Sequence, residues 1–198
     1  MTSTTTRQRP LDAAVRLRPV HLSDWPTIHE WARRPDVTQY QEWGPNRAVQ
    51  TREYVLAAIE AASELPQVRH VLSVVQGGLV VGLIELTVTD SRAGIADLGY
   101  AVHPEAWGRG VATAAARLAV RFAFNQLGIR IVNATCDTTN TASVRVLEKL
   151  GMRLEQTIPH HIWLGCRWRD THVFSLLAEE AVTAPAASQR ATCELVAR

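Results

Sequence analysis

The sequence predicts a single α+β domain in which antiparallel-looking strands alternate with helices. Its 198 residues suffice for one domain with a substantial hydrophobic core. Apolar residues that alternate with polar ones indicate strands, and apolar residues that recur with the helical period indicate helices. In addition, an apolar strand pattern over residues 97–102 leads into a turn at Gly108 and Gly110, directly before an Ala-rich amphipathic helix.

The first half of the chain is predicted to hold a strand, two helices and a hairpin. Residues 15–19 alternate as a strand does, and Ser23 is the expected N-cap of a helix over 24–32. A second helix is expected over 51–63. Gln76-Gly77-Gly78 separates two apolar runs and therefore predicts a hairpin with strands over 69–75 and 80–88.

The second half is predicted to alternate strands and helices, ending in two strands. A strand over 95–102 precedes the glycine turn, and the helix after the turn repeats its apolar face as far as Phe122. The remaining elements are a strand over 130–136, a helix over 140–151, and late strands over 154–164 and 168–177. These elements place the domain at residues 15–181. Residues 1–14 and 182–198 are predicted to be flexible tails, with a short helix over 191–197 as the alternative for the second.

The composition argues against several classes of protein. The net charge is only +2, which gives no strong footprint for nucleic acid or a membrane surface. Cys136, Cys166 and Cys193 are few, odd in number and widely spaced, which argues against a disulfide framework or a zinc site and predicts a cytoplasmic location. No apolar run reaches transmembrane length, and the first residues lack the apolar core of a signal peptide.

The glycine turn over residues 107–113 is predicted to bind an anion. Glycine lets the backbone approach a ligand closely, and the first N–H groups of a helix lack intrahelical partners. These donors and the helix dipole suit a phosphate or pyrophosphate. The turn lacks the Lys-Ser/Thr of a P-loop, and Thr113 replaces the third Gly or Ala of the dinucleotide fingerprint. A nicotinamide enzyme stays open as an alternative, which a test of NAD binding would decide.

A second segment narrows the choice of ligand. Asn140-x-x-Ser143-x-x-x-Leu147-Glu148-Lys149-Leu150-Gly151 follows the strand over 130–136. At this point the sequence resembles the GNAT superfamily of acetyl-CoA-dependent N-acetyltransferases. The segment is similar to the second cofactor segment of that family, and residues 107–112 resemble its Q/R-x-x-G-x-G/A pyrophosphate loop. Trp107 and Ala112 are variants typical of the RimJ/RimL-like branch. The resemblance extends over residues 15–180.

The resemblance implies a fold, a reaction and a cofactor site. The implied fold is the GNAT acyl-CoA N-acyltransferase fold, a mostly antiparallel twisted sheet flanked by helices. The implied reaction moves an acetyl group from acetyl-CoA to a primary amine by direct attack in a ternary complex. The implied cofactor contacts are Val102, Trp107, Gly108, Arg109, Gly110, Val111, Ala112, Thr113, Asn140 and Ser143. A backbone N–H near Val102 would polarise the thioester carbonyl, and a bulge at Gly99 would open a slot for pantetheine.

Three residues are candidates for the chemistry. Ser143 lies one helical turn after Asn140. The resemblance of the sequence to the RimJ/RimL-like branch implies that Ser143 donates a hydrogen bond to the departing thiolate. Glu85 and Asp97 are acids in two apolar strands, so each is either a general base in a cleft or a solvated surface acid. Strand alternation puts Asp97 and Tyr100 on opposite faces. Ordered water is an alternative carrier of the amine proton.

The acceptor site is expected among aromatic residues of two distant segments. The candidate substrate contacts are Tyr40, Glu42, Trp43, His160, His161 and Trp163, whereas Trp31 is expected to fill the core. The acceptor is either a small amine or a protein N-terminus, with no metal, nucleic acid or membrane as partner and with a homodimer through the late strands left open. The alternative function is a non-catalytic acyl-CoA sensor of the same fold.

Overall fold

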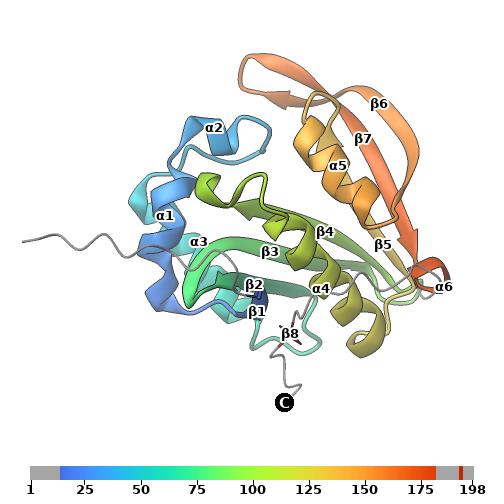
Figure 1. Cartoon of the computed structure of the whole chain (residues 1–198), viewed down its shortest axis with the longest axis horizontal. Helices are drawn as coiled ribbons and strands as arrows, with labels where there is room; N and C mark the ends of the chain where they lie inside the picture. The colour runs from blue at the N-terminus through green and yellow to red at the C-terminus, as the bar shows by residue number, and fades with distance from the viewer. Residues whose placement is uncertain (1–13, 182–191, 194–198) are drawn as a thin grey trace, which may run out of the picture.

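The computed structural model describes residues 14–181 and 192–193. Within these residues a single mixed sheet has the strand order β6-β7-β5-β4-β3-β2-β1-β8 (Figure 1). Its strands are β1 Arg16–Pro19, β2 Arg69–Gln76, β3 Leu79–Asp90, β4 Ile95–Val102, β5 Ile131–Asp137, β6 Arg153–Leu164, β7 Arg167–Leu177 and β8 Thr192–Cys193. Neighbours are antiparallel except for the parallel pairs β4–β5 and β1–β8. The predicted α+β fold with a mostly antiparallel sheet is confirmed.

Helices cover both faces of this sheet (Figure 1). They are α1 Trp25–Ala32, α2 Pro35–Thr38, α3 Ala48–Ala61, α4 Val111–Gln126, α5 Thr141–Lys149 and α6 Ala178–Ala181, with 3₁₀ turns η1 Leu22–Asp24 and η2 Pro104–Ala106. Alternate residues of β2 serve two cores: Leu72 and Val74 pack with α4 and α5, whereas Val71 packs with α1 and α3. The period-two pattern of the strands therefore supports a layer of helices on each side.

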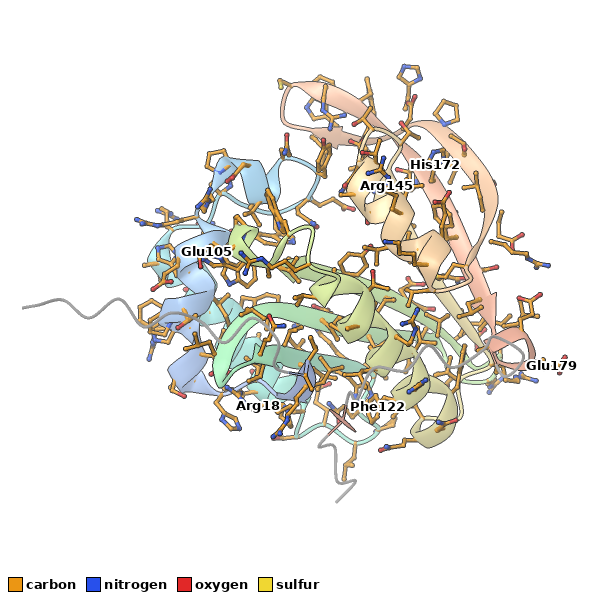
Figure 2. All side chains as sticks on the ribbon, in the orientation of Figure 1. Arg18, Glu105, Phe122, Arg145, His172 and Glu179 are labelled. Carbon is orange, nitrogen blue, oxygen red and sulfur yellow. The ribbon has the colours of Figure 1, made fainter. Side chains whose placement is uncertain are left out.

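The helix after the glycine turn has the apolar face that the sequence predicts. The buried residues of α4 include Val111, Ala115, Leu118, Ala119 and Phe122. The ring of Phe122 (labelled in Figure 2) meets the ring of His70 on β2 in a T-shaped contact, with centroids 5.6 Å apart. Packing of this face fixes the start of α4 relative to the sheet, and with it the glycine turn.

The strands β4 and β5 separate part-way along their length, and this opening positions the site. They pair only over residues 95–97 and 131–133. Each then continues alone on this side, β4 to Val102 and β5 to Asp137. Over the same stretch β4 stays paired with β3, and β5 stays paired with β7. A slot therefore runs between the two halves of the sheet beyond Asp97.

The prediction of a bulge at Gly99 is wrong, although the slot between β4 and β5 is present. Gly99 pairs in register with Glu85, and the register of β3 and β4 shifts only near Val88 and Asp90, at the other end of the pair. The slot opens because each strand keeps its antiparallel partner, while the parallel pair between them ends early.

The first helix begins differently from the prediction. Ser23 lies inside η1, and α1 starts at Trp25. Asp24 is the N-cap residue of α1, but its carboxylate makes no capping bond to that helix. It instead accepts the N–H of His21 at 2.9 Å, at the start of η1, and pairs with Arg18 at 2.7 Å. Asp24 is buried, so these partners compensate for its loss of hydration.

Two further differences concern the region before the hairpin. The short helix α2 was not expected from the sequence, and α3 begins at Ala48 rather than Thr51. The earlier start has a local cause: the side-chain oxygen of Gln50 accepts the backbone N–H of Arg47 at 2.8 Å. This bond satisfies a donor at the helix start and extends the helix by most of a turn.

The predicted tails lie mostly outside the described residues. Residues 192–193 are the exception in the second tail, because they pair in parallel with residues 16–17 of β1 as a two-residue strand. At these two positions the chain is therefore a strand, and neither a loose tail nor the alternative helix. Among the described helices, none has the length and apolar character that crossing a membrane requires.

Candidate active site

The glycine turn forms an open cradle at the start of α4. Gly108 and Gly110 have φ of 70° and 75°, a left-handed conformation that favours glycine. No heavy atom lies within 4 Å of where a Cβ would stand on either residue. Since Ala114 N–H makes the first bond of the helix, to Gly110 O, the N–H groups of residues 111–113 have no intrahelical acceptor. The turn can therefore hold a pyrophosphate against its backbone donors.

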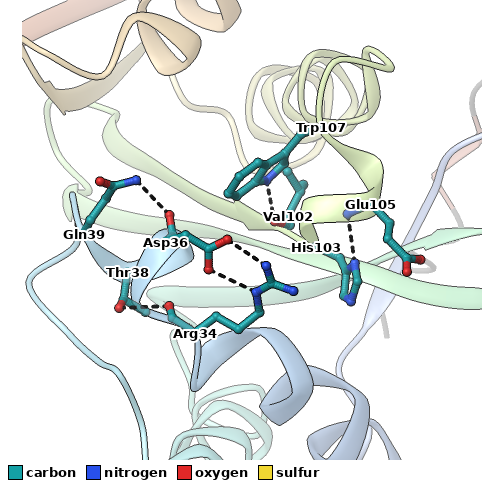
Figure 3. A network of polar contacts seen from close by, with 8 residues as sticks. All are labelled: Arg34, Asp36, Thr38, Gln39, Val102, His103, Glu105 and Trp107. Atoms are coloured by element: carbon teal, nitrogen blue, oxygen red, sulfur yellow. Dashed lines mark hydrogen bonds and ion pairs between the residues drawn. The ribbon is translucent and has the colours of Figure 1, made fainter.

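Trp107 ties this turn to the end of β4. Its indole Nε1–H donates to Val102 O at 2.9 Å, a contact drawn in Figure 3 beside the bond from Glu105 N–H to His103 Nδ1. Trp107 and Arg109 are exposed, Val111 is buried in the core, and Ala112 and Thr113 are half-buried. The indole thus braces the turn, and Trp107 and Arg109 both remain open to a ligand.

The backbone N–H of Val102 faces the slot. His103 N–H donates to Val81 O of β3 at 2.8 Å, so these two residues form a hydrogen-bonded pair of the antiparallel ladder. Such pairs alternate along a ladder, and Val102 and Tyr100 therefore direct their backbone groups away from β3. On that side β5 has already separated. The N–H of Val102 is therefore open to a ligand in the slot, at the place where the family resemblance implies a donor.

The start of α5 brings Ser143 to the same slot. Asn140 Oδ1 caps the helix by accepting the N–H of Ser143 at 3.1 Å. The hydroxyl of Ser143 lies 2.7 Å from the phenol oxygen of Tyr100. Burial raises the pKa of Tyr100, although the bond with Ser143 opposes this, and burial raises the pKa of the nearby Cys136 thiol to about 11. Two neutral hydroxyl groups therefore meet in this part of the slot.

Tyr100 is a candidate site residue that the sequence analysis did not name. The alternation that placed Asp97 on one face placed Tyr100 on the other, and only the position of α5 reveals that its phenol meets Ser143. The available signal was the absence of any tyrosine after Tyr100 in a chain expected to need a hydroxyl near the thioester sulfur.

On the opposite face of β4 lies a cavity of about 420 Å³. Its walls come from α1 and the loop after α2 (Ile28, Trp31, Ala32, Gln41, Trp43, Asn46), from α3 (Thr51, Tyr54), from β3 (Leu83, Glu85, Thr87), from β4 (residues 97–101) and from Thr135 of β5. Because both β4 and β5 contribute to the wall, the cavity reaches the slot. Its size is that of a site for a small organic molecule.

The two candidate acids, Glu85 and Asp97, both line this cavity, but their carboxylates differ in bonding partners and in the direction of their pKa shifts. Glu85 accepts bonds from Arg69 at 2.6 and 3.1 Å and from Tyr54 at 2.7 Å. Burial raises the pKa of Glu85, but these bonds outweigh it and lower the pKa overall. Asp97 keeps contact with solvent; partial burial raises its pKa, and a bond with Asn133 only partly offsets this. Asp97 is thus the better proton acceptor.

The loop after α2, which carries Tyr40, Glu42 and Trp43, supplies only one of the three substrate contacts expected from it. Trp43 lines the cavity, whereas Tyr40 and Glu42 do not. The backbone oxygen of Tyr40 accepts a bond from Arg169 at 3.3 Å, and Glu42 lies 3.8 Å from the same guanidinium. Trp31 also lines the cavity but is only 1% exposed, in agreement with its predicted role in the core.

The structure does not bring His160, His161 and Trp163 to the cavity. All three are exposed on the β6–β7 hairpin, and none lines the cavity wall. The N–H of His160 donates to Asp170, at a break in the β6–β7 register where His160 has a φ of 48°. Trp163 stacks edge to face on Trp168. Sequence alternation could not show that this hairpin projects past the other strands.

Within the described residues, no group of three or more His, Cys, Asp or Glu side chains could hold a metal ion. Cys136 and Cys166 are both free thiols, the first buried and the second exposed. The features that stand out are therefore an anion cradle, a slot between two strands, and a cavity that opens to the slot from the other face.

A mixed sheet that parts beside a helix start with free backbone donors can hold a long ligand that carries a pyrophosphate. The family comparison agrees: residues 14–153 match the acetyltransferase (GNAT) domain, and the chain belongs to this family of N-acetyltransferases.

Sequence relatives cover most of the chain. It is 26% identical over 165 residues to an uncharacterized N-acetyltransferase, p20, of Bacillus licheniformis, covering 83% of this chain and 93% of p20. It is also 26% identical over 162 residues to the spermidine N(1)-acetyltransferase of Escherichia coli, covering 81% and 84% of the two chains.

Solved structures share the fold. A GNAT-family acetyltransferase from Bacillus anthracis has a TM-score of 0.74 and 26% identity, covering 83% of this chain and 95% of its own. RimL, the ribosomal L7/L12 α-N-protein acetyltransferase, in complex with coenzyme A has a TM-score of 0.76 at 18% identity, covering 87% and 98%. The RimL likeness shows a shared fold.

Proposed function

We propose that this N-acetyltransferase moves the acetyl group of acetyl-CoA to a primary amine, by direct attack in a ternary complex. One observation carries the proposal: the anion cradle at the start of α4 and the cavity beside Asp97 both open to the slot between β4 and β5. A donor that enters from the helix side and an acceptor that enters from the cavity would therefore meet in one place.

The residues that would hold acetyl-CoA fit its chemistry. The N–H groups of residues 111–113 suit the pyrophosphate, Arg109 adds an exposed positive charge, and Asn140 caps the helix whose Ser143 reaches Tyr100 of β4. The free edge of β4 offers backbone groups to pantetheine, as to an added strand. The bound coenzyme A in the RimL structure supports this assignment.

Three sets of groups at the slot would serve the thioester oxygen, the departing sulfur and the attacking amine. The N–H of Val102 would donate to the thioester oxygen; comparable donors are worth about 100- to 1,000-fold in kcat. The linked hydroxyls of Tyr100 and Ser143 would supply a proton or a hydrogen bond to the thiolate as the C–S bond breaks. Asp97 would accept the proton of the attacking amine, directly or through water.

The buried cysteine supports direct attack rather than an acetyl-enzyme. The pKa of Cys136 is raised to about 11 by burial, which keeps this thiol protonated at neutral pH. Nucleophilic catalysis needs the thiolate. A ternary complex in which the amine attacks the thioester itself avoids this difficulty.

The acceptor is a small amine-bearing molecule or a protein N-terminus. The similar E. coli protein acts on spermidine, and RimL acts on a protein N-terminus, so the relatives support both kinds of acceptor. A homodimer and a cytoplasmic location stay predictions. The alternative function, an acyl-CoA sensor, shares the cradle and the slot but predicts no turnover.

Titration and steady-state kinetics test this proposal together. The purified protein should bind acetyl-CoA and CoA saturably but not NAD, and its initial rates with an amine panel should give intersecting double-reciprocal lines. Parallel lines would indicate an acetyl-enzyme and contradict direct attack. Binding of acetyl-CoA without transfer to any amine would favour the sensor.

A further inference from the structure

Within the part of the chain that the structure describes, the ionisable side chains that line the cavity wall include two acids and no base. Among the described residues that line it, the acids are Glu85 and Asp97, and there is no lysine, arginine or histidine. An acceptor amine is a cation in neutral solution, and the fixed charges around it decide which further groups it can carry.

Glu85 contributes little net charge, because a cation lies directly on it. The guanidinium of Arg69 approaches its two carboxylate oxygens at 2.6 and 3.1 Å, and it also lies over the ring of Tyr54, 5.0 Å from the centroid. The phenol of Tyr54 donates a third bond, at 2.7 Å. The carboxylate of Glu85 is therefore taken up by hydrogen bonds from Arg69 and Tyr54.

Asp97 is the acid whose carboxylate remains available to bind an amine. Its carboxylate bonds to the neutral amide of Asn133, the residue with which Asp97 pairs at the last step of the β4–β5 ladder. Asp97 therefore provides one uncompensated negative charge, at the point where the slot begins.

The rest of the wall is aromatic, aliphatic or neutral. Trp31, Trp43 and Tyr54 supply rings, Ile28 and Leu83 supply aliphatic groups, and the remaining polar groups are amides and hydroxyls. Such a wall suits an apolar or aromatic body. It has no cation to receive a carboxylate and no second free acid to receive another ammonium.

We infer that the acceptor is a small monoamine with an aromatic or aliphatic body and no carboxylate, its amino group held by Asp97. This inference rests on the proposed function. In the reaction the amine nitrogen forms a bond to the acetyl carbon, and the bond from that carbon to sulfur breaks. The ammonium first loses one proton through Asp97 to solvent, which frees the nitrogen lone pair for attack, and the nitrogen loses a second proton by the same route once the N–C bond has formed. The departing thiolate receives a proton from the Tyr100–Ser143 pair, which regains it from solvent.

A matched panel of acceptors tests the inference. Phenethylamine, phenylalaninamide and phenylalanine share one body and differ in the group beside the amine, and spermidine adds further ammonium groups. We expect kcat/KM with phenethylamine to exceed that with phenylalanine and with spermidine by at least about tenfold, because the fixed charge of Asp97 repels a carboxylate and extra ammonium groups find no partner. Phenylalaninamide should fall between phenethylamine and phenylalanine.

Two variants assign the selectivity to Asp97. Asp97→Asn should lower kcat/KM for phenethylamine and collapse its ratio to phenylalanine toward one, while CoA binding stays at the parent level and shows that the variant is folded. Glu53→Gln removes an acid from an exposed position on α3, outside the cavity, and should leave the ratio unchanged. An undiminished ratio in Asp97→Asn would overturn the role of this residue.

The outcomes separate this inference from the proposed function. Faster acetylation of phenylalanine, spermidine or a peptide N-terminus than of phenethylamine would overturn the monoamine assignment and leave acetyl transfer standing. Saturable acetyl-CoA binding with no acetylated product from any of these acceptors would overturn the proposed function itself.

Discussion

The phenol oxygen of Tyr100 lies 2.7 Å from the hydroxyl of Ser143, across the gap where β4 and β5 no longer pair. Tyr100 comes from β4, and Ser143 comes from the first turn of α5. The contact links β4 to the helix that follows β5, beside the gap where pantetheine would lie. It also means that the two hydroxyls act as one unit, since either can donate to the other.

Removal of either hydroxyl should therefore slow the reaction. General acid catalysis is worth about 10²–10⁴-fold, so Ser143→Ala and Tyr100→Phe should each lower kcat toward that range while the Kd for CoA changes little. The double variant should be no slower than the slower single variant, because linked groups are not additive. Steady-state kinetics of the three variants measure this, and Ser91→Ala, in an exposed turn, is the control. If Ser143→Ala and Tyr100→Phe both keep kcat within about twofold of the parent, neither hydroxyl acts as the acid.

A pair of glycine variants tests the anion cradle. Gly110 and Gly128 flank α4, both have a positive φ, and neither has an atom within 4 Å of its Cβ position. Alanine at either site should cost about 1–2 kcal/mol of stability through backbone strain. Only Gly110→Ala places a methyl group in the cradle, so only this variant should weaken CoA binding, by about tenfold or more. Thermal unfolding and calorimetric titration separate the two effects, and equal CoA affinity in both variants would argue against the cradle.

Arg169 is predicted to hold the wall of the acceptor cavity. Its side chain is only 5% exposed and reaches from β7 to the backbone oxygen of Tyr40 and toward Glu42, in the loop that also carries Trp43. Arg169→Gln should therefore raise the KM for the amine and speed hydrogen exchange in residues 39–47, with CoA affinity near that of the parent. Arg153→Gln, on the exposed surface of β6, is the matched control. Unchanged exchange in the loop would mean that other contacts fix it.

His70 should make the fold sensitive to acid. Burial lowers the pKa of His70 below its ordinary value of 6.5, and Nε2 has no hydrogen-bond partner. Below pH 6.5 the unfolded chain gains this proton before the folded chain does, so the free energy of unfolding should decrease as the pH falls through that window. His70→Leu should remove this component, which thermal unfolding at pH 7.5 and pH 5.5 can measure. The exposed variant His161→Leu should follow the parent, and an identical pH response in His70→Leu would contradict the prediction.

The elements that carry the cofactor site could be predicted because their signals are local. The glycines of the turn, the Asn140 cap three residues before Ser143, and the alternation that puts Asp97 and Tyr100 on opposite faces of one strand each depend on neighbours in the sequence. The same locality explains why most strand and helix limits fall close to those expected from hydrophobic period and turn residues.

The parts that sequence reasoning missed depend on contacts between distant segments. Arg69 of the neighbouring strand β2 neutralises Glu85, and no pattern in the sequence of either strand predicts this ion pair. Tyr100 meets a residue 43 positions later. The exposed positions of His160 and Trp163 likewise follow from how far the β6–β7 hairpin projects, which the period of a strand does not specify.

A crystal structure of the protein with bound CoA tests the central claim most directly. We predict the pyrophosphate on the N–H groups of residues 111–113, pantetheine between β4 and β5, and the sulfur within hydrogen-bond reach of Tyr100 or Ser143. A CoA molecule whose pantetheine lies outside the gap, or whose sulfur lies far from both hydroxyls, would contradict the account.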